Sequence, residues 1–286
     1  MGTATTVAGL LDDATRRLSS TLDLTQRDAR LEARVLAAHA LQVDPAWLIA
    51  HDTDTLKPAQ VAGFDALLMQ RLAGIPVAYV VGAREFYGRR FQVTPDVLIP
   101  RPDTELLVEC ALQAMPPRRS LEVLDLGTGS GCIAITLALE RPDARVTAID
   151  QSAAALEVAR RNARHLGASV VFQAGDWFSP LGGQQFDLIV SNPPYIAAHD
   201  PHLSRGDLRF EPVGALASGA DGLDDLRAIV AASRSHLKPG GVCLLEHGWD
   251  QVGAVCSLFR QQGWHAPTSW PDLAGILRVS GGKLSE

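Results

Sequence analysis

The sequence has few of the features that mark membrane, secreted or zinc-binding proteins. No apolar stretch reaches the roughly 18 residues that a membrane-spanning helix needs, and no basic segment followed by an apolar core opens the chain. The four cysteines show no CxxC spacing, so we expect reduced, buried thiols and no metal site. These absences predict a soluble, cytoplasmic protein.

Basic residues are also fewer than acidic ones. The chain of 286 residues carries 26 Lys and Arg against 32 Asp and Glu, which gives a formal net charge of −6. Proteins that hold bare nucleic acid normally present a basic surface. The composition therefore argues against free nucleic acid as a partner.

The length fits a main domain with a smaller one beside it, and the two halves differ in pattern. Up to residue 75 apolar residues recur at three- and four-residue spacing, which predicts a small helical domain without a chemical motif. Residues 76–100 are rich in β-branched and aromatic residues, broken by Gly82, Gly88 and Pro95. They predict a β-hairpin linker.

Residues 101–286 alternate between short apolar strands and helices of ten or more residues. This alternation predicts an α/β fold with a Rossmann-like, doubly wound parallel sheet. The expected strands cover residues 121–127, 145–150, 169–176, 186–192 and 240–248. Ligands of such sheets bind outside the carboxyl ends of the strands, and three features of the sequence fall there.

The first feature is the glycine-rich turn after the first strand. It contains Gly127, Thr128, Gly129, Ser130 and Gly131. Glycines at alternate positions permit a tight turn and a close approach of a ligand to the backbone. The spacing is GxGxG, whereas the pyrophosphate of a dinucleotide is typically bound by GxGxxG.

The other two features are Asp150 and the pair Asp176-Trp177, which end the next two strands. A carboxylate at Asp150 can accept hydrogen bonds from both ribose hydroxyls, although an N-cap for the following helix would explain it too. Trp177 can stack on an adenine with Asp176 at its amino group, or simply pack in the core. Together the three features predict a pocket that binds adenosine and has no phosphate-binding motif. The order of these motifs resembles Rossmann-like methyltransferases that use S-adenosylmethionine.

The sequence Asn192-Pro193-Pro194-Tyr195 ends the fourth strand. It could be a plain terminator, because proline removes backbone donors and fixes φ. Its chemistry suggests more. An amide nitrogen is a poor nucleophile, and two acceptors aimed at its N–H groups raise its electron density. The Asn192 side-chain oxygen and the Pro193 carbonyl are suited to this catalytic role, with Tyr195 packed on the planar acceptor.

Over nearly its whole length the sequence resembles the peptide chain release factor glutamine methyltransferases. The matching stretches are REFYG (84–88), IPRPDTE (99–105), LDLGTGSG (124–131), GDWF (175–178), FDLIVSNPPYI (186–196), RFEP (209–212), DGL (221–223) and LLEHG (244–248). IPRPDTE separates this family from relatives that methylate a glutamine of a ribosomal protein. Ile276-Leu277 departs from the polar pair that the family tends to carry there.

The resemblance implies a cofactor, a substrate and a set of site residues. S-adenosylmethionine would contact Gly127–Gly131, Asp150, Trp177 and Asn192, and the substrate side chain would lie against Asn192–Tyr195. The substrate implied is the glutamine of the GGQ motif in class-I release factors, whose methylation modulates translation termination. The helical domain would dock the release factor, and we expect a monomer.

Two alternatives stay open at this point. One is a methyltransferase for adenine or guanine amino groups, and the other is a non-catalytic module that binds S-adenosylmethionine. Near the pocket edge, we assign His247 to packing and Glu246 to orienting loop backbone, without a catalytic role for either. Glu211 is a candidate for shaping the substrate loop.

Overall fold

The computed structural model describes residues 5–117 and 120–285. Contacts within the chain divide it into two compact units. The first comprises the residues up to Ala83 together with Ser204–Phe210, and the second comprises Arg84–Leu203 and the chain from Glu211 onward. Within the described ranges no helix has both the length and the apolar character to cross a bilayer.

The first unit is helical. Thr6 and Thr25 cap the first two helices by accepting hydrogen bonds from main-chain N–H groups, and prolines begin the next two. Buried leucines and alanines of these helices form one core with Phe64. The helices are α1 (Val7–Leu22), α2 (Gln26–Leu41), α3 (Pro45–Ala50), α4 (Pro58–Leu72) and α5 (Val77–Val81).

The stretch that the sequence predicts as a hairpin linker begins with a helix. Residues Val77–Val81 form α5, although valine favours strands. Pro76 precedes this helix, Gly82 ends it with a φ of 68°, and its valines pack on the helical core. The hairpin itself is limited to β1 (Ala83–Phe86) and β2 (Arg89–Gln92). Local end signals and packing therefore outweigh β-propensity here.

The segment Ser204–Phe210 belongs to the helical unit although it follows the fourth strand of the main sheet. Its anchor is the buried guanidinium of Arg71, which lies 3.1 Å from Asp207 and 2.7 Å from Glu32. The same guanidinium donates to the carbonyls of Gly74 and Ile75. One buried arginine thus joins three parts of this unit.

The second unit contains a seven-stranded sheet in the order β5-β4-β3-β6-β7-β9-β8. The first five strands of this order are parallel, and β9 runs antiparallel to both β7 and β8. This confirms the predicted doubly wound α/β sheet. The strands are β3 (Glu122–Leu126), β4 (Arg145–Asp150), β5 (Val170–Ala174), β6 (Phe186–Ser191), β7 (Leu237–Glu246), β8 (Thr268–Pro271) and β9 (Leu277–Lys283).

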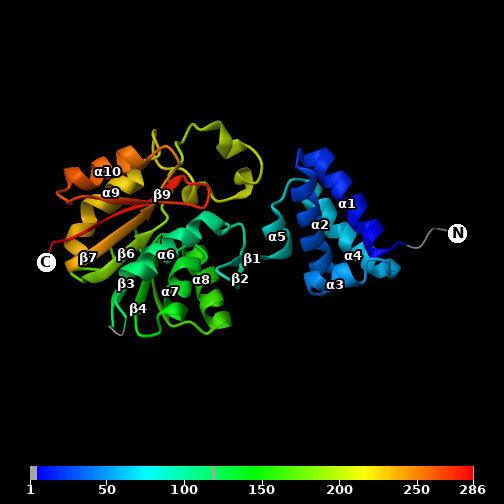
Figure 1. The fold of residues 1–286 in the computed structure, drawn as a ribbon, viewed down its shortest axis with the longest axis horizontal. Coiled ribbons are helices and arrows are strands. Elements are labelled where there is room, and N and C mark those ends of the chain that lie inside the picture. Colours follow the sequence, from blue (N-terminus) through cyan, green and yellow to red (C-terminus); the bar gives the residue numbers. More distant parts are fainter. Residues whose placement is uncertain (1–4, 118–119, 286) are drawn as a thin grey trace. The chain divides into compact units, whose positions relative to one another are not determined.

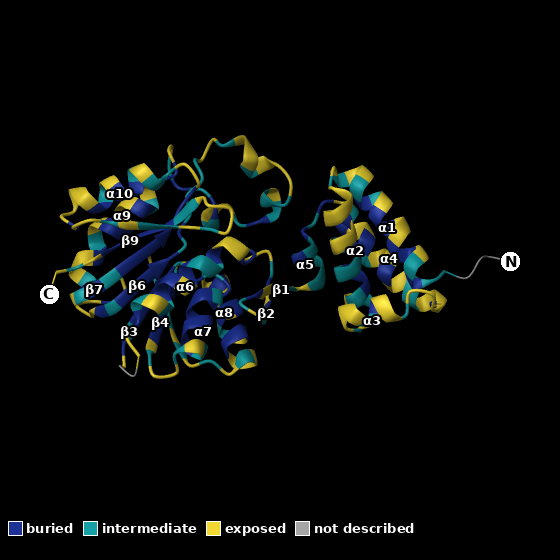
Figure 2. Cartoon of the chain, viewed as in Figure 1, coloured by how far each residue is buried: buried dark blue, intermediate teal, exposed yellow. Residues whose placement is uncertain are grey.

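Helices cover both faces of this sheet (Figure 1). Side chains of β3 alternate between the two faces, so that Val123 packs with α6–α8 and Leu124 packs with α9 and α10. Figure 2 shows the central strands buried and the outer helix faces exposed. The helices are α6 (Glu105–Ala114), α7 (Cys132–Glu140), α8 (Ala153–Leu166), α9 (Asp224–Ser233) and α10 (Val252–Gln261).

The strand order reverses between β3 and β6. From β3 the chain proceeds outward to β4 and β5, then returns to β6 on the other side. The Ser191 hydroxyl at the end of β6 donates to the Leu126 carbonyl at the end of β3 over 2.7 Å. In open α/β sheets a ligand crevice forms at such a switch point, so the carboxyl ends of β3 and β6 are the expected place for a site.

Candidate active site

A pocket opens at the carboxyl ends of β3, β4, β5 and β6. Its empty space, including the part open to solvent, is about 850 Å³. Seven residues that the sequence singles out line it. They are Gly127, Gly129, Asp150, Asp176, Trp177, Asn192 and Pro194.

The glycine-rich turn presents its backbone to this pocket. Gly127 has a φ of 70°, and a Cβ added to it would lie 3.3 Å from the ring of Trp177. The position therefore needs glycine both for its left-handed conformation and for the close approach of the indole. Gly129 also has a positive φ, and its N–H donates to Asp150 over 2.8 Å.

The remaining residues of the turn, Thr128, Ser130 and Gly131, do not line the pocket and instead pack or hydrogen-bond away from it. Thr128 is buried, and its hydroxyl donates to Asp125 over 2.6 Å. Ser130 is also buried, and its carbonyl accepts a hydrogen bond from Asn162. A Cβ on Gly131 would lie 2.7 Å from Ile135, so this glycine permits the start of α7 to pack closely.

Asp150 ends β4 and holds two backbone segments with its carboxylate. One oxygen accepts from Gly129 N–H and the other from Ser152 N–H, each over 2.8 Å. Burial raises the pKa of Asp150, and the two N–H groups act in the opposite direction. The helix cap itself is Ser152, which accepts from Ala155. Because each carboxylate oxygen can accept more than one hydrogen bond, Asp150 keeps acceptor capacity toward the pocket.

Trp177 has a φ of 44°, a conformation that bulky residues rarely adopt. Its ring is half-buried and packs partly on the core formed by α9 and α10. The indole therefore serves as a wall of the pocket and as part of the core at once. Such strain is typical of residues that a surrounding structure holds for function.

The corner after β6 places its polar groups at the same pocket. Asn192 is half-buried, and its Nδ2 donates to the Thr104 hydroxyl over 3.1 Å, which leaves Oδ1 unused by this bond. Pro193 is buried and Pro194 lines the pocket. The Tyr195 hydroxyl donates to Glu246 over 3.4 Å, and burial together with this carboxyl raises the pKa of Tyr195.

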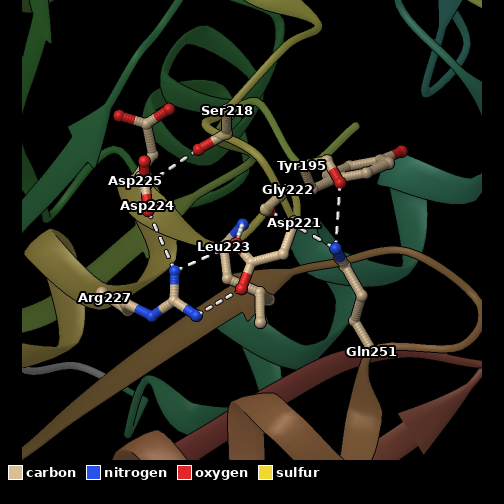
Figure 3. Close-up of polar contacts among 9 residues, drawn as sticks. All are labelled: Tyr195, Ser218, Asp221, Gly222, Leu223, Asp224, Asp225, Arg227 and Gln251. Carbon is tan, nitrogen blue, oxygen red and sulfur yellow. Dashed lines mark hydrogen bonds and ion pairs between the residues drawn. The ribbon is translucent and has the colours of Figure 1, made fainter. Parts of the chain in front are cut away.

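Gln251 braces the corner from the other side (Figure 3). Its Nε2 donates to the carbonyls of Tyr195 at 2.9 Å and Gly222 at 3.3 Å. Its Oε1 accepts from Gly248 N–H over 2.8 Å. One side chain thus connects the Asn-Pro-Pro-Tyr corner to the loops before α9 and after β7. The sequence analysis did not single out Gln251, and no local pattern marks it.

Two buried residues at the end of β7 have different surroundings. Burial raises the pKa of Glu246 to about 7, against smaller contributions from Thr104, Tyr195 and Arg278 that lower it. His247 is fully buried between Ser280 and the Gly248 carbonyl, and burial lowers its pKa. His247 does not line the pocket, which agrees with its assignment to packing.

Two further loops line the pocket and were not predicted as parts of it. They contribute Asp96, Val97 and Leu98 from the segment after the hairpin, and Pro212, Gly214 and Ala215 from the segment that begins at the last residue of RFEP. Glu211 connects them, because its buried carboxylate pairs with Arg101 and accepts from Ile99 N–H at 3.0 Å. Its role in shaping the substrate loop stays a prediction. In the part of the chain that the structure describes, no cluster of His, Cys, Asp and Glu could hold a metal ion.

The family comparisons agree with this geometry. Residues 102–206 match the family described as Methyltransferase small domain, and residues 10–82 match the one described as PrmC N-terminal domain. A crystal structure of a methyltransferase from Pyrococcus furiosus superposes with a TM-score of 0.54 at 18% identity, covering 78% of this chain and 98% of that one. The fold and the family model together define a Rossmann-like methyltransferase, with a pocket at the switch point of its sheet.

Sequence relatives narrow the class. The release factor glutamine methyltransferase of Bordetella pertussis is 57% identical over 89% of this chain and 95% of its own length. That of Burkholderia pseudomallei is 53% identical, over 89% and 92%. At this identity and coverage, the chain belongs to the release factor glutamine methyltransferase family.

Proposed function

We propose that this protein transfers a methyl group from S-adenosylmethionine to the side-chain amide nitrogen of the glutamine in the GGQ motif of class-I release factors. The observation that carries the proposal is the orientation of Asn192. Its Nδ2 is engaged by Thr104, so Oδ1 is the end left to accept from a substrate N–H group. Family membership supplies the identity of the substrate.

The pocket fits the methyl donor by its chemistry. Asp150 offers a carboxylate for ribose hydroxyls, Trp177 offers an aromatic face for adenine, and the turn at Gly127 and Gly129 leaves room for a ligand at the backbone. Among the residues that the structure describes, no lysine or arginine lines the pocket to hold phosphates. S-adenosylmethionine supplies a methyl group on a positively charged sulfonium, so the acceptor nitrogen needs only orientation and added electron density.

The Asn-Pro-Pro-Tyr corner is proposed to supply both the orientation and the added electron density. The Asn192 side-chain oxygen and the Pro193 carbonyl are proposed to accept the two N–H groups of the glutamine amide, which favours pyramidal geometry at nitrogen in the transition state. The prolines hold both acceptors in place before substrate arrives, so little reorganisation is needed. Tyr195 would pack against the planar amide. We assign the catalytic role to Asn192, Pro193 and Tyr195, with Pro194 as a further substrate contact.

The helical unit is proposed to dock the release factor. The whole protein is proposed to act as a monomer in the cytoplasm. The match of residues 10–82 to a domain named for this family supports a family-specific role. The net charge of −6 favours a protein partner over free nucleic acid. Light scattering of the purified protein tests the proposed monomer.

Transfer of label decides between the proposed function and its alternatives. Purified protein is incubated with labelled S-adenosylmethionine and either a class-I release factor or total RNA and DNA. We expect one methyl group on the GGQ glutamine by peptide mass spectrometry, and none on a release factor with that glutamine changed to alanine. Label on nucleic acid alone would overturn the proposal.

The same assay tests the corner. We expect Asn192→Ala to lower kcat by about 10²–10³-fold, by analogy with removal of one positioned transition-state hydrogen bond. Binding of S-adenosylmethionine, measured by calorimetry, shows whether the pocket of the variant is intact. An intact pocket with undiminished transfer would contradict the role given to the Asn192 side chain.

A further inference from the structure

Large apolar side chains are exposed at few places in the second unit. Among its described residues these are Val171, Val213, Trp249, Leu273 and Ile276. Val171 lies within β5, whereas the other four lie in segments that connect strands and helices. Scattered apolar residues on a surface are normal, but a gathering of them around a pocket marks an interaction site. The position of the four connecting residues relative to the pocket therefore decides their meaning.

The first of the four belongs to the wall of the pocket. Val213 lies between Pro212 and Gly214 in the chain, and both of these line the pocket. The Val213 side chain is 67% exposed, so it adds little to the packing of that wall. It presents an apolar group to solvent beside the pocket instead.

Trp249 lies in a turn that braces the Asn-Pro-Pro-Tyr corner. Gln251 closes this turn, because its main-chain N–H donates to the Gly248 carbonyl over 3.1 Å. The Gln251 side chain holds the Tyr195 carbonyl at the same time (Figure 3). Trp249 is 69% exposed, although tryptophan has a large apolar surface to bury. An exposed indole next to the brace of the corner is typical of a binding surface, where tryptophan is enriched.

The tip of the hairpin formed by β8 and β9 is connected to the same corner. Arg278 pairs with Asp272 of the tip at 3.3 Å and with Asp103 at 3.6 Å. Thr104 is the next residue of the chain, and its hydroxyl accepts a hydrogen bond from Asn192. A short series of contacts thus leads from the hairpin tip to the side chain that is proposed to hold the acceptor amide.

The hairpin tip is an ordered turn that exposes its apolar side chains. Asp272 Oδ1 accepts from the N–H groups of Ala274 and Ile276, each over 2.9 Å, and the Asp272 N–H donates to the Ile276 carbonyl over 2.8 Å. Leu273 is fully exposed, and Ile276 is 38% exposed. Because these hydrogen bonds already order the turn, a partner that binds there loses little affinity to ordering.

We propose that Val213, Trp249, Leu273 and Ile276 form an apolar rim that docks the class-I release factor through the backbone and apolar side chains next to its GGQ motif. The proposal rests on the proposed function, since the partner is the substrate named there. A glutamine side chain reaches the corner only if the chain that carries it crosses the edge of the pocket. The two glycines of the motif lack side chains, so their backbone can lie close to an apolar surface.

Leu273→Ser tests the apolar rim, because a fully exposed side chain is not needed for folding. We expect the KM for the release factor to rise about fivefold, as for truncation of an interface residue, while kcat and the Kd for S-adenosylmethionine stay unchanged. Trp249→Ser should act in the same direction. The matched control is Val171→Thr, because Val171 is 58% exposed and does not line the pocket. An unchanged KM in both Leu273→Ser and Trp249→Ser would overturn the proposal.

Light scattering distinguishes the release factor from a second copy of this chain as the partner. We expect wild type and Leu273→Ser to be monomers at the concentrations of the kinetic assay. A wild-type dimer that Leu273→Ser converts to a monomer would show that the apolar rim joins two copies, and would refute the docking of the release factor there.

Photo-crosslinking separates this proposal from the proposed function. Benzoylphenylalanine replaces Leu273 in one variant and Val171 in the other, and each is irradiated with the release factor. We expect mass spectrometry to find a crosslink from position 273 to a peptide that contains or adjoins the GGQ motif, and none from position 171. That crosslink, with no methyl transfer by wild type, would refute the proposed function and support the docking surface. Methyl transfer by wild type without the crosslink would refute the docking surface and keep the function.

Discussion

The side-chain amide of Gln251 donates a hydrogen bond to the main-chain carbonyl of Tyr195 over 2.9 Å, between residues 56 positions apart. The same amide reaches Gly222, and the three residues form a small joint below the Asn-Pro-Pro-Tyr corner (Figure 3). The geometry of the corner therefore depends on a loop that follows it and on the start of α10. The prolines alone do not hold it.

This joint leaves no space for a side chain at Gly222. Its φ is 76°, and a Cβ there would lie 2.3 Å from the Tyr195 carbonyl oxygen. We expect Gly222→Ala to displace the corner, lowering kcat by at least tenfold and stability by about 1–3 kcal/mol, the range for strain or overpacking. Steady-state kinetics and denaturant unfolding measure the two effects.

Gly167→Ala is the matched control for that variant. Gly167 has a φ of 72° at the end of α8, and no atom lies within 4 Å of an added Cβ. Gly167→Ala should therefore show the loss of stability that the left-handed conformation causes, without a steric clash. If both alanine variants keep full kcat, the joint does not position the corner.

Asp150 should act mainly on the affinity for the methyl donor. Its half-buried carboxylate lines the pocket together with Asp96, Asp176 and Asp225, and hydrogen bonds to charged groups contribute about 1.5–3 kcal/mol. We expect Asp150→Ala to raise the Kd for S-adenosylmethionine by about 10–100-fold in calorimetry. Because Asp150 also holds Gly129 and Ser152, circular dichroism must first show that the variant is folded at the temperature used. Unchanged Kd in a folded variant would exclude the ribose contact.

The buried ion pair of Arg71 should matter for the stability of the helical unit. Its side chain is 4% exposed and lies 2.7 Å from Glu32. We expect Arg71→Leu to destabilise this unit by about 3–5 kcal/mol, since it leaves a carboxylate without its partner. Arg16→Leu is the control, because the Arg16 side chain is 75% exposed and its pair with Asp13 is worth little. Scanning calorimetry of the whole chain should show an early transition for Arg71→Leu alone.

Asp125 should make stability fall as the pH rises. Burial raises its pKa to about 7, above the value near 3.8 of an unfolded chain, so the folded state binds the proton more tightly. Its stabilising effect is complete below pH 3.8 and is lost as the pH rises through 7. Glu246 acts in the same direction, whereas His247, whose pKa is lowered, acts in the opposite one.

The difference between wild type and Asp125→Asn isolates the contribution of this residue. Asparagine can still accept from Thr128 and does not ionise. We expect the denaturation midpoint of wild type to fall, relative to that of the variant, between pH 5 and pH 8. Parallel curves over this range would show that Asp125 does not titrate there.

The sequence by itself determined the five parallel strands of the sheet, the helices between them and the residues at the strand ends. Asp150 and Asn192 could be placed near one another because parallel strands bring their carboxyl ends to one edge, and the apolar patterns of β4 and β6 mark those ends. The helix at Val77–Val81 was missed because five residues, three of them valine, are too few to show a helical period.

Only the tertiary structure decided what supports these residues. Thr104, Gln251 and Glu246 reach the corner from elements 51 to 88 positions away, by hydrogen bonds that depend on how helices and strands pack. Local periodicity carries no information about such contacts, since each of these residues could equally cap a helix or face solvent. The sequence thus determined which strand-end groups meet at the pocket, whereas packing decided the rest of its lining and the direction in which Asn192 points its amide.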